Sequence, residues 1–347
     1  MNSEDLMLSG YVPKSRLVVE EHPRPCPYKK VIDIHTHFGR LGLGEDYEGK
    51  YDTALAVEKL KEQGVRKVVN LDGDWGSHLK KMLDKTKDFE DFFVHFGTVD
   101  LSKLDEKDFE AYARRTIVDS INRGIKGLKF WKNLGLDLKD KSGNYIPVDD
   151  SRLEVIWKTA AEFKLPILIH IADPMAFFSP VDRFNERFEE LRKHPGWSFY
   201  GPEWYTFEQL MGMQENLLAN NPDTVFIVAH MGSCAENLSY VAGCFDRYPN
   251  MYADIAMRIS EMGRQPYTSR SFFNKYQDRI LFGTDSVAGG YCDHSIYYRF
   301  FETFDEYFDY SSFEIPNQGR WKIYGIGLEP DVLEKLYYKN AEKILNI

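Results

Sequence analysis

Cysteine is scarce in this sequence, and long apolar runs are absent. The 347 residues include four cysteines, none of them in a Cys-x-x-Cys pair. This scarcity argues against a disulfide framework and favours free thiols in a reducing compartment. No run approaches the roughly 20 apolar residues of a membrane-spanning helix. The start, MNSEDLMLSG, lacks the basic and apolar parts of a signal peptide. We therefore expect a cytoplasmic protein with no membrane partner.

An excess of positive charge is also missing. Lysine and arginine number 44 against 54 acidic residues, so the formal net charge is −10. This balance argues against nucleic acid or an anionic membrane as a partner. We expect a small-molecule substrate instead, and the chain could also form a homo-oligomer. Because no linker rich in Gly, Ser or Pro interrupts the sequence, we expect residues 1–347 to form a single domain.

Short apolar runs alternate with helix-like segments along the chain. Continuous apolar strands separated by amphipathic helices indicate a parallel sheet covered by helices. Eight such runs predict an α/β fold, a closed (β/α)8 TIM barrel. An open doubly wound sheet is the alternative, but no Gly-x-Gly-x-x-Gly motif follows the first run. The expected strands lie at 31–35, 67–71, 92–99, 125–130, 166–170, 224–230, 251–256 and 279–285.

Two segments exceed what a barrel needs. Residues 1–28 precede the first strand as an N-terminal extension, and residues 171–206 follow the fifth strand as an insertion. Because the loops after barrel strands form the catalytic face, we expect 171–206 to lie over the barrel mouth as a lid. Helices are expected at 53–64, 109–124, 151–164, 207–222 and 328–347.

The first apolar run ends in two histidines. In KKVIDIHTHFGR, His35 and His37 are two residues apart, and strand residues at this spacing point to the same face. Asp33 is expected on that face too. Two convergent imidazoles are what a zinc-like ion prefers, although two partly buried polar residues are the alternative interpretation.

Three further polar side chains end the fifth, sixth and eighth runs. His170 ends LPILIH, His230 ends VFIVAH, and Asp285 ends ILFGTD. Each could by itself be a capping or buried polar residue. A barrel, however, brings the carboxyl ends of its strands together, so these groups should meet the two histidines of the first run at one mouth.

These motifs resemble those of the amidohydrolase superfamily. The resemblance runs from DIHTHFG through LPILIH and AHMG to LFGTD and YYKNAEKIL. It is closest to the amidohydrolase-related branch, the aminocarboxymuconate-semialdehyde decarboxylase-like metal-dependent hydrolases. The resemblance implies a barrel with one divalent metal ion, with zinc as the expected ion and manganese as an alternative. It also implies His35, His37, His170 and Asp285 as metal ligands and His230 as a catalytic residue.

Such a site suits hydrolysis of an ester, lactone or amide. A divalent ion held by imidazoles and a carboxylate leaves room for water and can lower the pKa of that water to ~7. Asp285 would take the proton, and His230 would polarise a carbonyl or orient the nucleophile. A non-oxidative decarboxylase could use the same site. A non-catalytic binding protein on a barrel scaffold is a third interpretation.

Other residues near the expected mouth bear on the substrate. Carboxylates together with flat aromatic rings suit a small polar, sugar-derived molecule. Lys129 ends the fourth run, where some superfamily members carry a carbamylated lysine between two metals. An ion pair or a substrate contact is the favoured interpretation here. The predicted substrate contacts are Asp72, Asp74, Lys129, Trp131, Trp204 and Arg258.

Overall fold

All eight apolar runs form strands of one parallel sheet, as predicted. The computed structural model describes residues 6–290 and 293–347. The strand order is β8-β7-β6-β5-β4-β3-β2-β1-β9, and neighbouring strands are parallel throughout. The strands are β1 (Val31–His37), β2 (Val65–Asn70), β3 (Phe93–Gly97), β4 (Gly127–Phe130), β5 (Ile167–Ile169), β6 (Phe226–Val228), β7 (Met251–Asp254), β8 (Ile280–Leu281) and β9 (Ser286–Val287).

The two ends of this sheet belong to a single run of the sequence, 280–287. Its first part, β8, pairs with β7, and its second part, β9, pairs with β1. Between the two parts, the Ile34 amide donates to the Phe282 carbonyl at 3.0 Å, and the Asp285 amide donates to the His35 carbonyl at 2.8 Å. The sheet therefore curls until its last run meets its first strand, which brings the carboxyl ends of the strands together.

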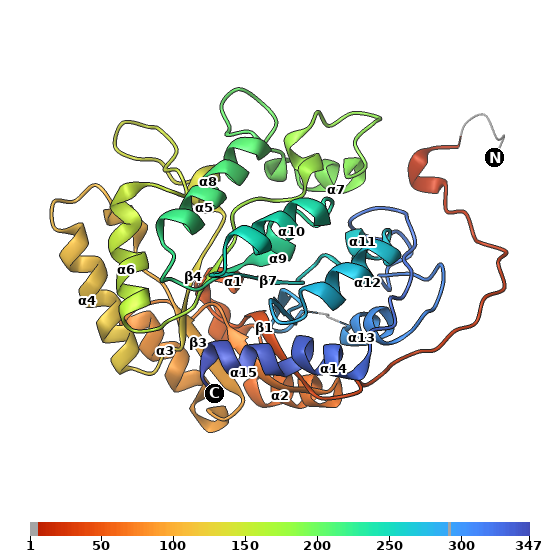
Figure 1. Cartoon of the computed structure of the whole chain (residues 1–347), viewed down its shortest axis with the longest axis horizontal. Coiled ribbons are helices and arrows are strands. Elements are labelled where there is room, and N and C mark those ends of the chain that lie inside the picture. The colour runs from red at the N-terminus through yellow and green to blue at the C-terminus, as the bar shows by residue number, and fades with distance from the viewer. Residues whose placement is uncertain (1–5, 291–292) are drawn as a thin grey trace.

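Helices lie outside the curled sheet (Figure 1). All five predicted helical segments are helical, and the last consists of α14, a π-helical turn at Lys335–Lys339 and α15. No described helix is long and apolar enough to cross a membrane. The main helices are α2 (Thr53–Glu62), α3 (Gly76–Thr86), α4 (Phe109–Asn122), α6 (Glu154–Glu162), α7 (Phe188–Lys193), α8 (Phe207–Asn220), α10 (Leu238–Arg247), α12 (Pro266–Lys275), α13 (His294–Glu302), α14 (Pro330–Glu334) and α15 (Asn340–Leu345).

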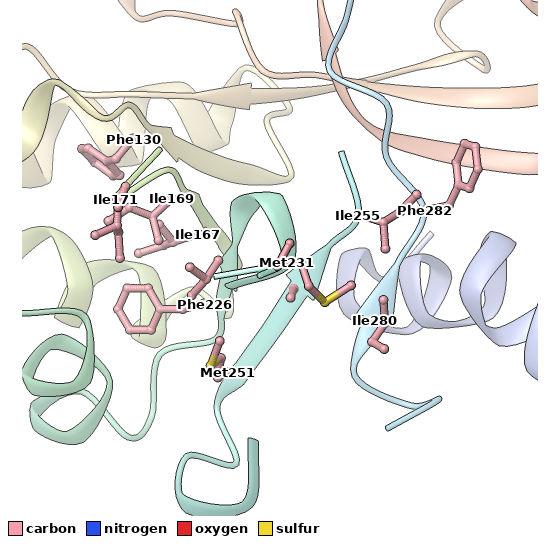
Figure 2. Close-up of a cluster of buried hydrophobic side chains, with 14 of the residues drawn as sticks. Phe130, Ile167, Ile169, Ile171, Phe226, Met231, Met251, Ile255, Ile280 and Phe282 are labelled. Carbon is pink, nitrogen blue, oxygen red and sulfur yellow. The ribbon is translucent and has the colours of Figure 1, made fainter. Parts of the chain in front are cut away.

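The alternation of strand side chains divides the apolar residues into two clusters. In β5, Leu168 belongs to one cluster, whereas Ile167 and Ile169 belong to the other. Figure 2 shows part of the larger cluster, to which Phe130, Ile167 and Phe226 of the sheet belong. The centroid of the Phe226 ring lies 5.8 Å from that of Trp157 in α6, so this cluster joins the sheet to the helices. The smaller cluster gathers residues across the sheet: Ile32, Ile34, Val69, Leu71, Val94, Phe96, Leu168, Ile227, Ala229 and Leu281, with Ala341 and Leu345 of α15.

The two predicted additional segments pack differently. Within 6–28, the described chain forms only a short 3-10 turn and lies at the periphery (Figure 1). It is held by the Tyr28 amide, which donates to the Glu302 carboxylate at 2.8 Å. In 171–206, Arg187 is buried and ion-paired with Glu261, which follows β7. The lid position of this insertion, and the single-domain organisation, remain predictions.

Candidate metal centre and active site

His35 and His37 are each held from behind by a buried carboxylate. His35 Nδ1 lies 2.8 Å from Asp254 Oδ2, and His37 Nδ1 lies 2.8 Å from Asp72 Oδ1. Because a carboxylate accepts the Nδ1 proton, the lone pair of each neutral ring is on Nε2. Both Nε2 atoms face Asp285 Oδ1, at 3.4 and 3.0 Å.

These contacts suit a divalent cation. Ligand atoms of His35, His37 and Asp285 all lie within 4.8 Å of one another. Without an ion, burial lowers the pKa of His37, but Asp72 and Asp285 raise it more, to about 9. Burial alone would raise the pKa of Asp285, yet the neighbouring histidines hold it well below its usual range. Two imidazole nitrogens and an ionised carboxylate are a donor set that fits zinc or manganese.

The first strand does not keep strict alternation, and the prediction that Asp33 shares the histidine face is wrong. The pairing of β1 with β2 shifts register between Asp33 and Thr36. Asp33 instead accepts from the Thr284 hydroxyl at 2.5 Å and contacts His294 Nε2 at 3.1 Å. It therefore ties β1 to the last run and to α13, behind the site.

His35, His37 and Asp285 are called the metal trio below. His170 lies beside this trio and is not part of it. Its Nδ1 is 3.2 Å from His230 Nε2, and its ring is outside the 4.8 Å group. Its Nε2 is buried and has no hydrogen-bond partner, although Asp173 Oδ1 is at ion-pair distance, 3.2 Å. Burial lowers the pKa of His170 to about 4. The neutral ring is competent as a ligand, so its predicted role as the fourth ligand stays a prediction.

His230 sits in a left-handed turn directly after β6. His230 and Met231 have φ values of 58° and 57°, a region that L-residues rarely adopt outside functional sites. The turn is stabilised by the His230 amide, which donates to Asp254 Oδ1 at 2.9 Å. His230 Nδ1 lies 3.0 Å from the Ala256 carbonyl, so Nδ1 carries the proton and Nε2 has the lone pair. Burial lowers the pKa of His230 well below its usual value, which favours this neutral form.

Lys129 and Trp131 form the other side of the site. Lys129 is fully buried, and its Nζ has no hydrogen-bond partner. Burial lowers its pKa to about 8, against the opposing attraction of nearby aspartates. The Lys129 Nζ lies 5.0 Å from the centroid of the Trp131 ring, and that ring lies 4.7 Å from the His37 ring.

Two of the predicted substrate contacts, Asp72 and Asp74, already accept hydrogen bonds from the protein. Asp72 Oδ2 accepts from the amides of Gly39 and Gly42, at 2.9 and 3.1 Å. Asp74 accepts from the Arg40 guanidinium at 2.7 Å. Asp72 therefore positions the His37 ring from behind. Asp74 forms an ion pair with Arg40.

Two other predicted contacts, Trp204 and Arg258, have their own neighbours in the fold. Trp204 stacks on Tyr145, with ring centroids 5.1 Å apart. Arg258 is buried, and its Nη1 donates to the Met257 carbonyl at 2.9 Å. Their contact with a substrate stays a prediction.

Sequence reasoning placed Asp72 at the mouth but missed its role behind His37, and Asp254, which holds His35, was not among the predicted contacts. It also missed Arg40 and the bond between Asp33 and His294. For Asp72 the sequence held a signal for this role, because Asp72 follows β2, and β2 lies next to the strand that carries His37. For Asp254 no such signal existed, since β7 and β1 are not adjacent in the sheet.

Comparison with known proteins agrees with this fold. The amidohydrolase family pattern matches residues 32–347, most of the chain. The chain belongs to the amidohydrolase family. No curated protein matches its sequence.

Solved structures share the fold of this amidohydrolase at low sequence identity. An uncharacterized TIM-barrel protein of Bordetella bronchiseptica is 15% identical, with a TM-score of 0.57 over 91% of this chain and 98% of its own. A 2,6-dihydroxybenzoate decarboxylase complexed with 2,6-dihydroxybenzoate is 14% identical, with a TM-score of 0.56 over 92% and 100%.

A third relative was solved with a metal. The 5-carboxyvanillate decarboxylase of Novosphingobium aromaticivorans, with bound manganese and 3-methoxy-4-hydroxy-5-nitrobenzoic acid, is 13% identical, with a TM-score of 0.52 over 92% and 98%. These likenesses show the TIM-barrel fold and no more. Family membership makes the chain an enzyme, which argues against a non-catalytic binding protein.

Proposed function

We propose that this protein is a metal-dependent hydrolase that cleaves an ester, lactone or amide bond of a small molecule. The observation that carries the proposal is the convergence of His35, His37 and Asp285, with both imidazole Nε2 atoms turned toward one carboxylate. A divalent ion held there, zinc or manganese, would supply Lewis-acid activation of water and of a carbonyl group.

The residues around this trio have separate tasks. Asp254 and Asp72 fix the ring orientation of His35 and His37, so these rings need no reorganisation to bind an ion. Asp285 is ionised and can accept a proton from the attacking water. His230, protonated on Nδ1, would offer its Nε2 lone pair to orient the attacking water, and Asp285 would then pass the proton that it took to the leaving group.

The insertion 171–206 supports a closed site of this kind. Asp173 lies 2.5 Å from Lys132 Nζ, which follows β4, and at ion-pair distance from His170 after β5. Arg187 pairs with Glu261 after β7. We propose that this segment acts as the wall or lid of the mouth within a single domain, where it would exclude water from the reacting groups.

Decarboxylation of a flat carboxylic acid is the second candidate. The observation that favours it is the Trp131 ring, which lies 4.7 Å from the His37 ring and offers a surface for a planar substrate. Both reactions would use the same ion site. They differ in the product, because only decarboxylation releases carbon dioxide.

The test starts from protein stripped of metal and reloaded with zinc or manganese. Lactones, esters and N-acyl compounds are screened for acid release, and aromatic carboxylic acids for carbon dioxide. We expect hydrolysis that disappears on chelation and returns with the ion. Asp285→Asn should lose both tight metal binding and turnover. Metal-independent turnover, or carbon dioxide as the product, would contradict the hydrolase proposal.

A further inference from the structure

Two buried hydrogen-bond donors beside the metal trio have no hydrogen-bond partner among the residues that the structure describes. Lys129 Nζ and Trp131 Nε1 are both shielded from solvent and make no hydrogen bond. An ammonium and an indole N–H can only donate, so each needs an acceptor. Because the great majority of buried polar groups in proteins are satisfied, two orphan donors in one place indicate a missing acceptor.

The two donors come from one turn of chain at the end of β4. Lys129 lies within β4, and Trp131 follows its last residue. The Lys129 Nζ is 5.0 Å from the Trp131 ring centroid, and the Trp131 ring is in contact with the His37 ring. The donors are therefore next to the trio but are not part of it.

None of the described carboxylates of the site accepts a hydrogen bond from either donor. Asp72 is held by His37 and two backbone amides, and Asp254 by His35 and the His230 amide. Asp285 faces the two Nε2 atoms. These aspartates offset the charge of Lys129 through space, but none of them accepts a hydrogen bond from it.

We propose that Lys129 and Trp131 form a subsite for an oxyanion group of the substrate, a carboxylate or a group of the same geometry, carried on a flat framework. This inference deepens the proposed function, and rests on it for the position of the scissile bond beside the trio. It replaces the expectation of a small polar, sugar-derived substrate. The acceptors which that molecule would need are already occupied at Asp72 and Asp74, whereas the free groups are donors.

The test compares benzoate with benzamide, two flat probes of nearly equal size that differ in charge. Binding is measured by calorimetry in the metal-loaded protein and again after chelation, since benzoate could also bind the ion itself. We expect benzoate to bind at least about tenfold more tightly than benzamide in both forms, because charge-assisted hydrogen bonds are the stronger kind.

Variants assign that preference to the two donors. Lys129→Met removes the ammonium and should abolish the preference. Trp131→Phe keeps a ring, loses only the N–H, and should weaken benzoate binding about threefold to tenfold. Trp321→Phe is the matched control, since its indole N–H is also buried without a partner, and Lys158→Met controls for net charge at an exposed site. Both controls should keep the preference.

The outcomes separate this subsite from the metal centre. If benzamide binds as well as benzoate, if neither probe saturates, or if Lys129→Met keeps the preference, the subsite does not exist. Metal content, measured in every variant, should stay at the wild-type level in Lys129→Met. A subsite that fails while metal-dependent hydrolysis of neutral lactones persists would leave the proposed function intact. A preference that persists in a protein without metal-dependent turnover would refute only the proposed function.

Discussion

The two sides of the barrel mouth differ in how completely their polar atoms are paired. On the side of β1, β7 and the last run, His35 and His37 are each fixed by an aspartate, and Asp254 also holds the turn that carries His230. On the side of β4 and β5, Lys129, Trp131 and His170 each bury an atom with no hydrogen-bond partner in the described part of the chain, although the His170 atom lies 3.2 Å from Asp173 Oδ1. The first side is organised before anything binds. The second side is completed only by a ligand.

This difference has a physical basis. A cation centre needs rings of fixed tautomer and direction, which the protein supplies through second hydrogen bonds. A substrate subsite must leave donors open, at a cost of about 1–3 kcal/mol for each unsatisfied buried group, and binding regains this free energy. The contrast between a paired and an unpaired side therefore predicts which substitutions abolish metal binding and which change substrate binding.

The largest effect should come from removing the paired side's own ligands. The double change of His35 and His37 to Ala removes both Nε2 donors, so we expect loss of bound metal and of all measurable turnover. The fold should survive, because the ligands lie at strand ends, outside the packed layers of the barrel. Metal analysis and circular dichroism check this. A double variant that keeps its metal would show that the ion lies elsewhere.

His230 should separate chemistry from metal binding. His230→Asn removes the Nε2 lone pair but leaves the trio unchanged. We expect bound metal at the wild-type level and turnover reduced by ~10²–10⁴, the usual scale for one general acid or base. Steady-state kinetics should show a smaller change in KM than in kcat. Loss of the metal in this variant would instead make His230 a ligand, as its proximity to His35 and Asp254 allows.

The aspartates behind the histidines should have a smaller effect. Asp72→Asn and Asp254→Asn keep the size of the side chain but weaken its hold on the ring, so we expect metal affinity to fall about 10–100-fold. Asp74→Asn is the matched control, because Asp74 pairs with Arg40, whereas His35 and His37 are held by Asp254 and Asp72. Asp254→Asn should also reduce turnover of the metal-loaded enzyme more than Asp72→Asn, since only Asp254 holds the His230 amide. Equal affinities in all three variants, measured by competition with a chelator, would contradict a positioning role.

Much of this arrangement could be predicted from the sequence. The eight strands follow from short apolar runs, and the convergence of His35, His37 and Asp285 follows from their places at strand ends. The prediction for Asp33 failed because it assumed regular alternation, whereas β1 shifts register before Thr36. The partners of Asp72 and Asp254 could not be predicted, since a carboxylate at a strand end can face a substrate or a histidine with equal chemical sense. The neighbours of His170 depend on its side-chain torsions, which no spacing determines.

The smallest effect is the response of the metal-free protein to pH, where the two sides should act in opposite directions. His37, on the paired side, has a pKa raised to about 9, against an unperturbed value of 6.5. Its contribution to stability is complete below pH 6.5 and is lost as pH rises through 9. His170, on the unpaired side, has a pKa lowered to about 4. As pH falls from 6.5 through 4, the His170 ring becomes protonated in the unfolded chain before it does in the folded protein. This lowers the free energy of unfolding.

Together, these two residues place a stability maximum near pH 6.5, with a loss of at most about 3.5 kcal/mol on each side. Urea unfolding at several pH values measures it. His37→Gln should flatten the alkaline side alone, and His170→Gln the acidic side alone. Added zinc should remove the alkaline loss, because an ion at Nε2 replaces the proton that Asp285 otherwise stabilises. An alkaline slope that is the same in His37→Gln and the wild type would show that His37 does not hold its proton through Asp72 and Asp285. The paired side would then lack the electrostatic character that distinguishes it.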